Sequence, residues 1–451
     1  MKYFRCLLFL FSFGLLFVFQ TGIAQETSLM RVGAASRDAT PEIGTETFAW
    51  GKSVGVKTPL LTQVLYLEKN NERLFWVVNE LIAVESDFAR QIQNELSGLF
   101  QIDQANVLVS ATHTHSSPAT MRSSGDYWGP YCDVYLDQKL RPLILDAAKE
   151  ALSNAEDCEM ISVEGQCSLS IERRDKPTRH LDQRVPCLAW KRKDGSFKAT
   201  LLLYAMHPSA YIYYSGEPIV FAAEWPGSVS RALRENLPGN PVSLVLNGAC
   251  GNINSPKRNP TDEEMFAWGN EIAHSVLEKI MNSQPLENPS FIVTQTNASL
   301  EYNVLTEAEI IKTAESLFNE GTSFWDVKRN AAGHDWKTSR LNELSNETGK
   351  SRSLDVHGVL LGNRYFLTLP LEVFSRFNLY MNEKRNHSIP VYCVGYTNGE
   401  FGYLFHKEAY EEGGYEPSSH LYYNHFQIKQ GELECLVDQL LPFVQKTTDS
   451  L

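Results

Sequence analysis

The chain has 451 residues, of which 43% are hydrophobic and 11% aromatic, and its formal net charge at pH 7 is −13. This composition supplies enough apolar surface for a large buried core, and the length alone suggests two or three domains. The acidic balance argues against nucleic-acid binding, because proteins of that class present a basic face to phosphates.

The N-terminus begins with Lys2 and Arg5, which precede a long apolar run that ends in small residues. This order is typical of a secretory signal peptide, which we expect over residues 1–24. Residues 25–451 would then be exported to the periplasm, the outer surface or the medium. A membrane anchor is the alternative, because the apolar run is long enough to cross a bilayer.

The cysteines show no metal-binding spacing. Of the 8 cysteines, Cys6 lies in the N-terminal run, and the other seven form no CxxC pair. An exported chain can form disulfides, but an odd number with these spacings names no partners. We interpret most of them as small buried apolar residues. They are Cys132, Cys158, Cys167, Cys187, Cys250, Cys393 and Cys435.

Strand-like and helix-like runs alternate along the chain, with no internal repeat. In chain order, the patterns predict strands over 62–68 and 73–79, a helix over 85–100, a strand over 106–111, a helix over 135–155, a strand over 199–207, a helix over 226–237, a strand over 241–252, a helix over 261–281 capped by Thr261 or Asp262, a hairpin over 357–370 with its turn at Gly362-Asn363, and a strand over 390–397.

This alternation predicts an α/β fold of mixed β-sheets layered with covering helices. No stretch rich in proline, glycine and serine separates independent units, so we expect one large domain over 25–451. The stretch from about 306 to 354 is charged, helical in pattern and poor in strands. We expect it to be a helical insert between two sheet regions.

Polar side chains that can carry chemistry follow several of the predicted strands, and strand ends are where α/β proteins build sites. His113 and His115 follow the strand over 106–111. Because residues i and i+2 of a strand point to the same side, the two imidazoles are expected to share one target. The other candidates are His207, the loop Asn247–Ser255, Glu372, which we expect to open a helix, and Tyr403.

Two histidines and a carboxylate form a common catalytic zinc shell that leaves one position open for water. Zinc in such a shell polarises a carbonyl group and lowers the pKa of its water. The patterns HExxH and GxSxG are absent from the chain. Each residue also has a structural alternative: His207 as a hydrogen-bonded histidine, Tyr403 as a core residue, and the histidines together as a cluster without metal.

The same stretches resemble the catalytic domain of the neutral/alkaline non-lysosomal ceramidase family. The similarity runs in order from about Met30 to the C-terminus, and it covers the helical insert poorly. It rests on the segments RVGAASRDATP, ATHTHSSPA, MHPSA with AAEWPG downstream, NGACGNINSP, LPLEVF and NGEFGYLFHKEAYEEGGYE. No β-sandwich domain like the one that follows the catalytic domain in full-length ceramidases is expected here.

The resemblance implies a zinc ion held by His113, His207, Glu372 and Tyr403. It implies that His115 lies beside the metal, where it orients water or transfers a proton.

For the remaining catalytic residues, the resemblance implies Tyr415 as a second tyrosine and Arg173 near the reacting carbonyl or headgroup, with Arg174 as its rival. Asn254 aligns with the family's serine, and Ser255 stands one place further on. Direct attack by a zinc-activated water is therefore the expected mechanism. In two further positions the family's aspartate is replaced, by Asn252 and by Glu224.

We therefore expect an exported zinc-dependent amidohydrolase that cleaves an N-acyl amide resembling ceramide. A zinc-dependent hydrolase of another amide, an ester or a sugar-derived substrate is the main alternative. A non-catalytic binding relative that retains the metal is the second. The expected partner is a small-molecule or lipid substrate. Peripheral contact with a membrane is compatible with both kinds of substrate, and no nucleic-acid partner is expected.

Overall fold

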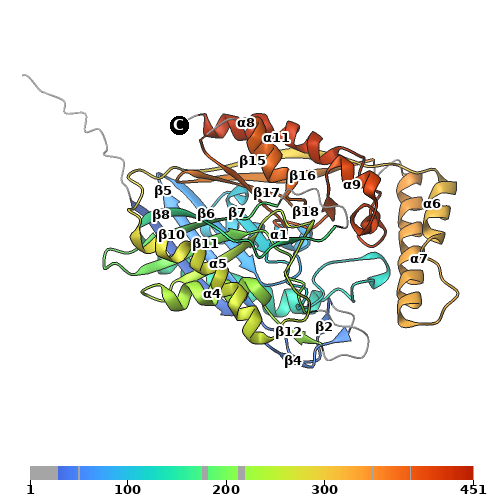
Figure 1. Cartoon of the computed structure of the whole chain (residues 1–451), viewed down its shortest axis with the longest axis horizontal. Helices are drawn as coiled ribbons and strands as arrows, with labels where there is room; N and C mark the ends of the chain where they lie inside the picture. The colour runs from blue at the N-terminus through green and yellow to red at the C-terminus, as the bar shows by residue number, and fades with distance from the viewer. Residues whose placement is uncertain are drawn as a thin grey trace, which may run out of the picture.

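The computed structural model of the chain describes residues 29–48, 51–174, 181–211, 219–346, 350–385 and 388–449. Two β-sheets pack face to face, and helices cover their outer faces (Figure 1). The predicted α/β class, with mixed sheets and covering helices, is confirmed. The signal peptide expected over 1–24 lies outside the described residues. Within the described ranges, no helix combines the length and the apolar character needed to cross a bilayer.

The larger sheet has eight strands in the described part of the chain. The strands pair antiparallel except at the two edges, where the pairs β6–β7 and β11–β13 are parallel. Each parallel pair is joined by a helix that crosses over the sheet, as parallel pairing requires. The spatial order is β13 (Val242–Asn247), β11 (Phe197–Tyr204), β10 (Arg184–Lys191), β8 (Glu156–Gln166), β1 (Leu29–Asp38), β5 (Leu61–Lys69), β6 (Glu72–Asn79) and β7 (Val107–Ala111).

The smaller sheet packs its inner face on the larger one. It contains the predicted hairpin, whose turn includes Gly362 at φ 59°. Trp76 and Trp190 of the larger sheet share a buried core with Phe366 and Tyr392 of the smaller sheet. The order is β15 (Phe291–Glu301), β16 (Ser351–Leu361), β17 (Arg364–Thr368) and β19 (Val391–Val394).

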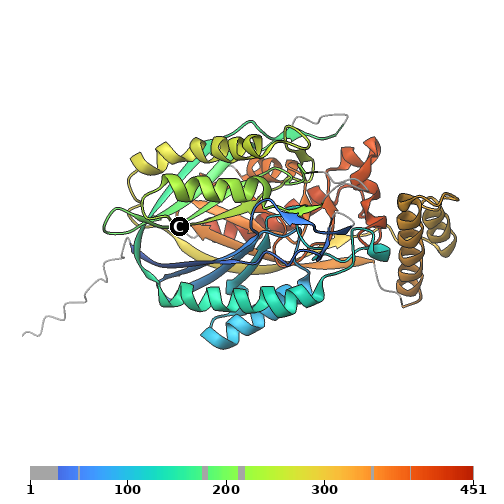
Figure 2. The same cartoon turned by 90° about the horizontal axis from the view of Figure 1, so that it is seen from below.

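Helices cover the outer faces of both sheets. Against the larger sheet, α1 (Ser86–Phe100) and α3 (Arg141–Ser153) cover one half, and α4 (Glu224–Asn236) and α5 (Asp262–Asn282) cover the other (Figure 2). Against the smaller sheet lie α8 (Arg376–Arg385) and α11 (Glu432–Thr448). Of the two expected caps of α5, Thr261 is the N-cap, and it forms a capping box with Glu264.

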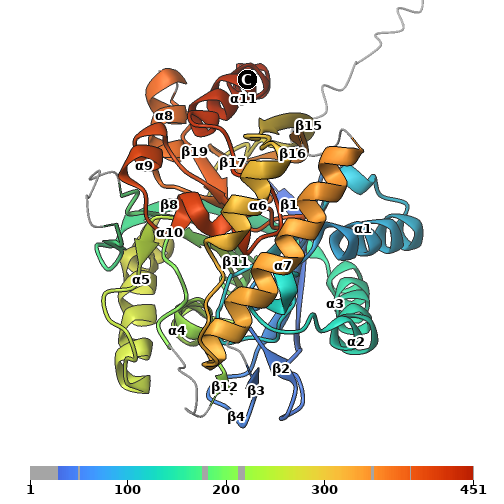
Figure 3. The same ribbon diagram turned by 90° about the vertical axis from the view of Figure 1, so that its right-hand side faces the viewer.

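Two helices, α6 (Glu307–Glu315) and α7 (Phe324–Ser345), follow β15 and precede β16 in the sequence. They stand at one end of the molecule, which faces the viewer in Figure 3. Strand β16 begins at Ser351, so residues 351–354 of the expected insert belong to the sheet instead. Their pairing with β15 decides this, because backbone hydrogen bonds to a neighbouring strand override a charged local pattern.

Short elements lie between the longer ones. They include the strand pairs β2 (Glu46–Thr47) with β3 (Gly51–Lys52), β4 (Gly55–Val56) with β12 (Val220–Phe221), β9 (Ile171–Glu172) with β14 (Ile253–Asn254) and β18 (Glu372–Val373) with β20 (Tyr403–Leu404), and the helices α2 (Asp133–Tyr135), α9 (Lys407–Glu412) and α10 (Tyr415–Ser418).

The seven cysteines of the described chain are all free thiols, and five of them are buried, as the sequence predicts. Only Cys435 is exposed, and Cys132 is partly buried. These thiols therefore act mainly as small apolar side chains.

Candidate metal centre and adjoining cleft

The candidate site lies where strands β7, β11 and β13 end. His113 follows β7, and His207 follows β11. The segment after β19 joins the two edges of the larger sheet at this point, because the Ala111 amide donates to the Tyr396 carbonyl at 3.0 Å and the Gly395 amide donates to the Asn247 carbonyl at 3.1 Å. Residues far apart in sequence therefore meet at one corner of the molecule.

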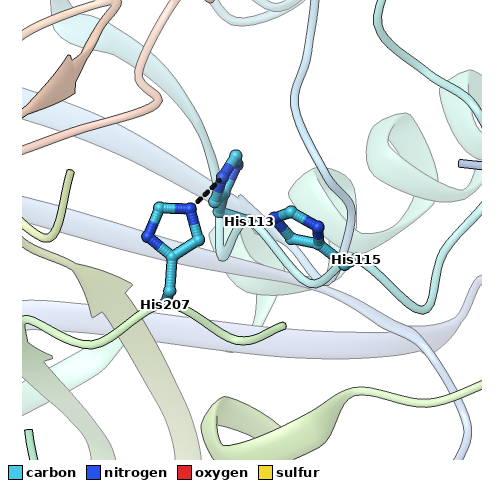
Figure 4. A group of neighbouring side chains, drawn as sticks. All are labelled: His113, His115 and His207. Atoms are coloured by element: carbon cyan, nitrogen blue, oxygen red, sulfur yellow. Dashed lines mark hydrogen bonds between the residues drawn. The ribbon is translucent and has the colours of Figure 1, made fainter. Parts of the chain in front are cut away.

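Three buried side-chain atoms converge at this corner. His113 Nε2 lies 3.2 Å from His207 Nε2, and each of these atoms lies 3.3 Å from Glu372 Oε2. Figure 4 shows the two imidazoles facing each other, with His115 beside them. Zinc–nitrogen bonds of about 2.0–2.1 Å in a tetrahedron put neighbouring ligand atoms about 3.3 Å apart. The spacing of the three atoms therefore fits a tetrahedral metal ion.

The hydrogen bonds of the two imidazoles support the same conclusion. His113 Nδ1 lies 2.7 Å from the Ile82 carbonyl, and His207 Nδ1 lies 3.1 Å from the Cys250 carbonyl. A carbonyl only accepts, so each Nδ1 carries the proton and each Nε2 of a neutral ring carries a lone pair. Burial lowers the pKa of His207 to about 4, which keeps that ring neutral.

Glu372 Oε2 is buried and accepts no hydrogen bond within the described residues. Two imidazole lone pairs and a carboxylate oxygen therefore face one another with no donor among them. Such an arrangement suits a cation, and imidazole and carboxylate are both ligands of zinc. The donor set and its spacing fit a metal ion.

Glu372 reaches this place from a strand, and the helix start predicted for it is wrong. It begins β18, whose residue Glu372 pairs with Tyr403 of β20, while α8 begins only at Arg376. The parallel pairing with β20 decides the local conformation. The hydroxyl of Tyr423 donates to Glu372 Oε1, so Oε2 is left to face the histidines.

His115 joins the two imidazoles, but not through strand geometry as expected. Strand β7 ends at Ala111, and His113 adopts the left-handed region with φ 69°. A non-glycine residue held in that region is strained and is common at functional sites. The ring centroids of His115 and His113 are 5.0 Å apart, and ligand atoms of all three histidines lie within 4.8 Å of one another.

The environment of His115 favours its neutral form. Burial, then the charges of the neighbouring histidines, lower the pKa of His115 well below its usual value. Its Nε2 is buried and has no hydrogen-bond partner among the described residues. This nitrogen is therefore available to a water or a substrate that occupies the corner.

Arg173 and Arg174 take different roles. The guanidinium of Arg174 lies 2.5 Å from Glu416, 3.2 Å from Glu412 and 2.8 Å from the Gly413 carbonyl, so its donors are engaged in holding the chain together. Arg173 also pairs with Glu416, at 2.5 Å. Its guanidinium, however, also lies over the Tyr403 ring, 5.1 Å from the ring centre.

Tyr403 and Tyr415 stand beside this arginine. The Tyr403 and Tyr415 rings meet edge to face at 5.7 Å, and Arg173 lies 5.9 Å from the centre of the Tyr415 ring. The pairing of β18 with β20 places Tyr403 next to Glu372. The two tyrosines and the arginine thus connect the surroundings of Glu372 to the surface, where Tyr415 is 37% exposed.

A cleft of about 460 Å³ opens beside these residues. We call it the arginine cleft, and we call the group His113, His115, His207 and Glu372 the histidine corner. The arginine cleft is lined by Arg173, Arg174, Ser209, Asn254, Arg258, Glu412, Gly413, Gly414, Tyr415 and Glu416.

The loop Asn247–Ser255 contributes unequally to the two regions. Asn254 faces the arginine cleft, whereas the hydroxyl of the buried Ser255 donates to the Lys257 carbonyl at 3.4 Å. Asn252 ties two other segments together, since its amide donates to Glu172 at 2.8 Å and its carbonyl oxygen accepts from the Ser375 amide at 2.8 Å. Asn254 is thus the residue of this loop that lines the arginine cleft.

Glu224 links the loops that carry His115 and His207. It accepts from the hydroxyl of Ser116 at 2.9 Å and from the amide of Ala210 at 2.8 Å. Burial raises the pKa of Glu224 to about 8. A buried protonated carboxyl at this bridge sets the spacing of the two loops.

Sequence reasoning missed three residues that shape the histidine corner. Tyr423 orients Glu372, and Tyr396 stacks on His113 with ring centroids 4.0 Å apart and an interplanar angle of 16°. The thiol of Cys250 lies 3.1 Å from the Tyr396 hydroxyl. No local pattern marks these residues, because their contacts join segments that are distant in sequence.

Comparisons with known proteins place the fold. Neither a family model nor a curated protein matches the chain. Among solved structures, the chain is similar to the neutral ceramidase from Pseudomonas aeruginosa, with a TM-score of 0.68 and 13% sequence identity over 93% of this chain and 75% of that one. It is also similar to a ceramidase complexed with C2, with a TM-score of 0.68 and 14% identity over 93% of this chain and 76% of that one. At this identity, the likeness is one of fold.

Proposed function

We propose that this protein is an exported, zinc-dependent hydrolase of the neutral ceramidase type that cleaves an N-acyl amide. The observation that carries the proposal is the convergence of His113 Nε2, His207 Nε2 and Glu372 Oε2, three buried acceptors within 3.3 Å of one another. The likeness in fold to ceramidases supports the reaction class.

His113, His207 and Glu372 would hold the zinc, with Tyr403 as the fourth ligand. When bound, zinc supplies a water of lowered pKa and polarises a carbonyl group. The carbonyls of Ile82 and Cys250 fix both imidazoles with Nε2 toward Glu372, and they would thereby orient the two rings as ligands of the metal.

The other side chains would act on the substrate. His115 Nε2, neutral and unpartnered, accepts the proton of the attacking water and returns it to the leaving amine. Arg173, with Tyr415 beside it, stabilises the negative charge that develops on the carbonyl oxygen. Asn254 donates its amide to the substrate, and because it lacks a hydroxyl, no covalent acyl-enzyme forms there.

Two alternatives differ in substrate and in activity. A zinc hydrolase of another amide, an ester or a sugar-derived substrate would use the same histidine corner with a different group in the arginine cleft. A non-catalytic relative would retain the metal alone. The presence of all four candidate ligands, His113, His207, Glu372 and Tyr403, favours catalysis over this second alternative, because a site that has lost its activity usually loses a ligand as well.

The test combines metal content with hydrolysis. The protein, H113A and H274A are purified, loaded with zinc and assayed on a fluorogenic ceramide and on a panel of simple amides, esters and lactones. His274 is an exposed histidine of α5 and serves as the matched control. We expect about one zinc per chain and turnover in the protein and in H274A, and loss of both in H113A. A chain that takes up no zinc would refute the proposal.

A further inference from the structure

The arginine cleft is positively charged in an acidic protein. The chain has a formal net charge of −13, yet three arginines line this one cleft. Glu412 and Glu416, which also line it, pair with Arg173 and Arg174. Two carboxylates cannot neutralise three guanidinium groups, so the cleft retains one positive charge.

That charge belongs to Arg258. Arg258 is exposed, and within the described residues its side chain makes no ion pair or hydrogen bond. The neighbouring Lys257, by contrast, pairs with Glu264 at 2.8 Å and does not line the cleft. One cation of this loop is therefore engaged, and the other is free in the cleft.

The wall that carries Arg258 is connected to the histidine corner. Ser209 follows His207 by two residues, and Asn254 follows Ile253, whose carbonyl accepts from the His207 amide at 3.3 Å. A group bound between Ser209, Asn254 and Arg258 therefore lies a short distance from the candidate metal. The lining of the cleft contains no aliphatic side chain, so it suits a polar group better than a hydrocarbon chain.

We propose that the substrate carries an anionic group, a carboxylate or a phosphate, close to the scissile amide, and that Arg258 binds it with the help of Ser209 and Asn254. This inference rests on the proposed function and narrows its substrate class. Guanidinium groups bind carboxylates and phosphates through paired, charge-assisted hydrogen bonds, and hydroxyl and amide donors complete such sites.

The test measures binding by calorimetry to the full chain without metal, so that no turnover is needed. The first pair of probes is N-hexanoylglycine, which carries a carboxylate, and the neutral N-hexanoylglycinamide. The second pair is N-hexanoyl-O-phosphoethanolamine, which carries a phosphate, and the neutral N-hexanoylethanolamine. We expect at least about tenfold tighter binding of the charged member of one pair, and the pair that shows it identifies carboxylate or phosphate. This preference weakens with salt.

Three variants assign the preference to one residue. R258Q should lose it, R258K should keep part of it because a charge remains, and K257Q should leave it unchanged. Equal binding of charged and neutral probes by the protein, or a preference that survives in R258Q, would overturn the inference. Arg258 is exposed, so unfolding midpoints of the variants should match and exclude a folding defect.

Failure of this inference is distinguishable from failure of the proposed function. If the protein binds the charged probes preferentially but the zinc-loaded protein hydrolyses none of the probes, the proposed hydrolase activity is refuted and the anion-binding site is supported. If the zinc-loaded protein hydrolyses both members of each pair at equal rates, the hydrolase activity is supported and the anion-binding site is refuted.

Discussion

The histidine corner and the arginine cleft are adjacent, but they are built in opposite ways. In the histidine corner, backbone carbonyls of Ile82 and Cys250 orient the rings, and three acceptors face one another without a donor. In the arginine cleft, side chains orient one another through the ion pairs of Arg173 and Arg174 with Glu416. The first brings lone pairs together in a buried place, whereas the second pairs its charges, except at Arg258, within the described residues.

This difference predicts which property a substitution in each region should change: metal binding and activity, or stability. A change in the histidine corner removes a ligand but leaves few unsatisfied groups, so it should affect metal and activity more than stability. A change in the buried pairs of the arginine cleft leaves a charge without its partner, so it should affect stability more than metal.

The largest expected effect is the loss of Glu372. In E372A, two neutral imidazoles remain, and we expect zinc affinity to fall more than about 100-fold, since even groups behind a ligand contribute 10–100-fold. Zinc titration against a competing chelator measures this. E263A, which removes an exposed carboxylate of α5, is the control. Unchanged zinc affinity in E372A would remove this carboxylate from the metal site.

Breaking the buried pairs should show the reverse pattern. R174Q leaves Glu416 and Glu412 partly unpaired in a buried place, and we expect the free energy of unfolding in urea to fall by about 3 kcal/mol. Zinc content should stay at the level of the unmodified protein. R231Q breaks the exposed pair with Glu235 and should cost less than about 1 kcal/mol. Equal costs for the two variants would contradict the assigned roles.

Tyr423 should matter to the metal without being a ligand. Y423F removes the hydroxyl that donates to Glu372 Oε1, so the carboxylate can rotate away from the histidines. We expect zinc affinity to fall about 10–100-fold. Y422F, which keeps the neighbouring ring in its contact with Tyr415, should leave zinc affinity unchanged. A drop of the same size in Y422F would point to packing rather than to the hydroxyl.

The bridge at Glu224 predicts a pH dependence. Because burial raises its pKa from 4.5 to about 8, the folded state keeps a proton that the unfolded state loses as pH rises. The stability that this group contributes is therefore complete below pH 4.5 and is lost as pH rises toward 8. The glutamine in E224Q does not titrate, so the variant lacks this loss. When the pH rises from 6 to 7, its free energy of unfolding should therefore increase by about 1 kcal/mol relative to that of the unmodified protein. Urea unfolding of both proteins at both pH values tests this. An equal change of the free energy of unfolding in the two proteins would contradict it.

The smallest expected effect concerns the loop between the two regions. S255A removes a hydroxyl whose one hydrogen bond within the described residues goes to the Lys257 carbonyl, and we expect kcat/KM on any amide that is hydrolysed to change by less than about twofold. N254A, whose side chain faces the arginine cleft, should lower it more. A loss of activity in S255A beyond 100-fold would instead make Ser255 a nucleophile.

Much of the architecture could be predicted from local patterns. The apolar runs that became β5, β6, β7, β11 and β13 were recognisable because strands buried between layers need apolar side chains on both faces. Strands β1, β8, β10 and β15 were not predicted. In β15, for example, polar residues such as Gln295 and Asn297 alternate with others on a partly exposed strand, so the local signal is weak.

By itself, the sequence determined that His113, His115 and His207 stand at strand ends, because a strand and the loop after it are encoded within a few residues. Only the tertiary structure decided that Glu372 sits in a strand pair and not at a helix start, that Tyr423 holds it, and that Ile82 and Cys250 orient the rings. These contacts join residues 31, 43 and 51 positions apart. Packing of whole layers sets such contacts, and no local preference of the chain encodes them.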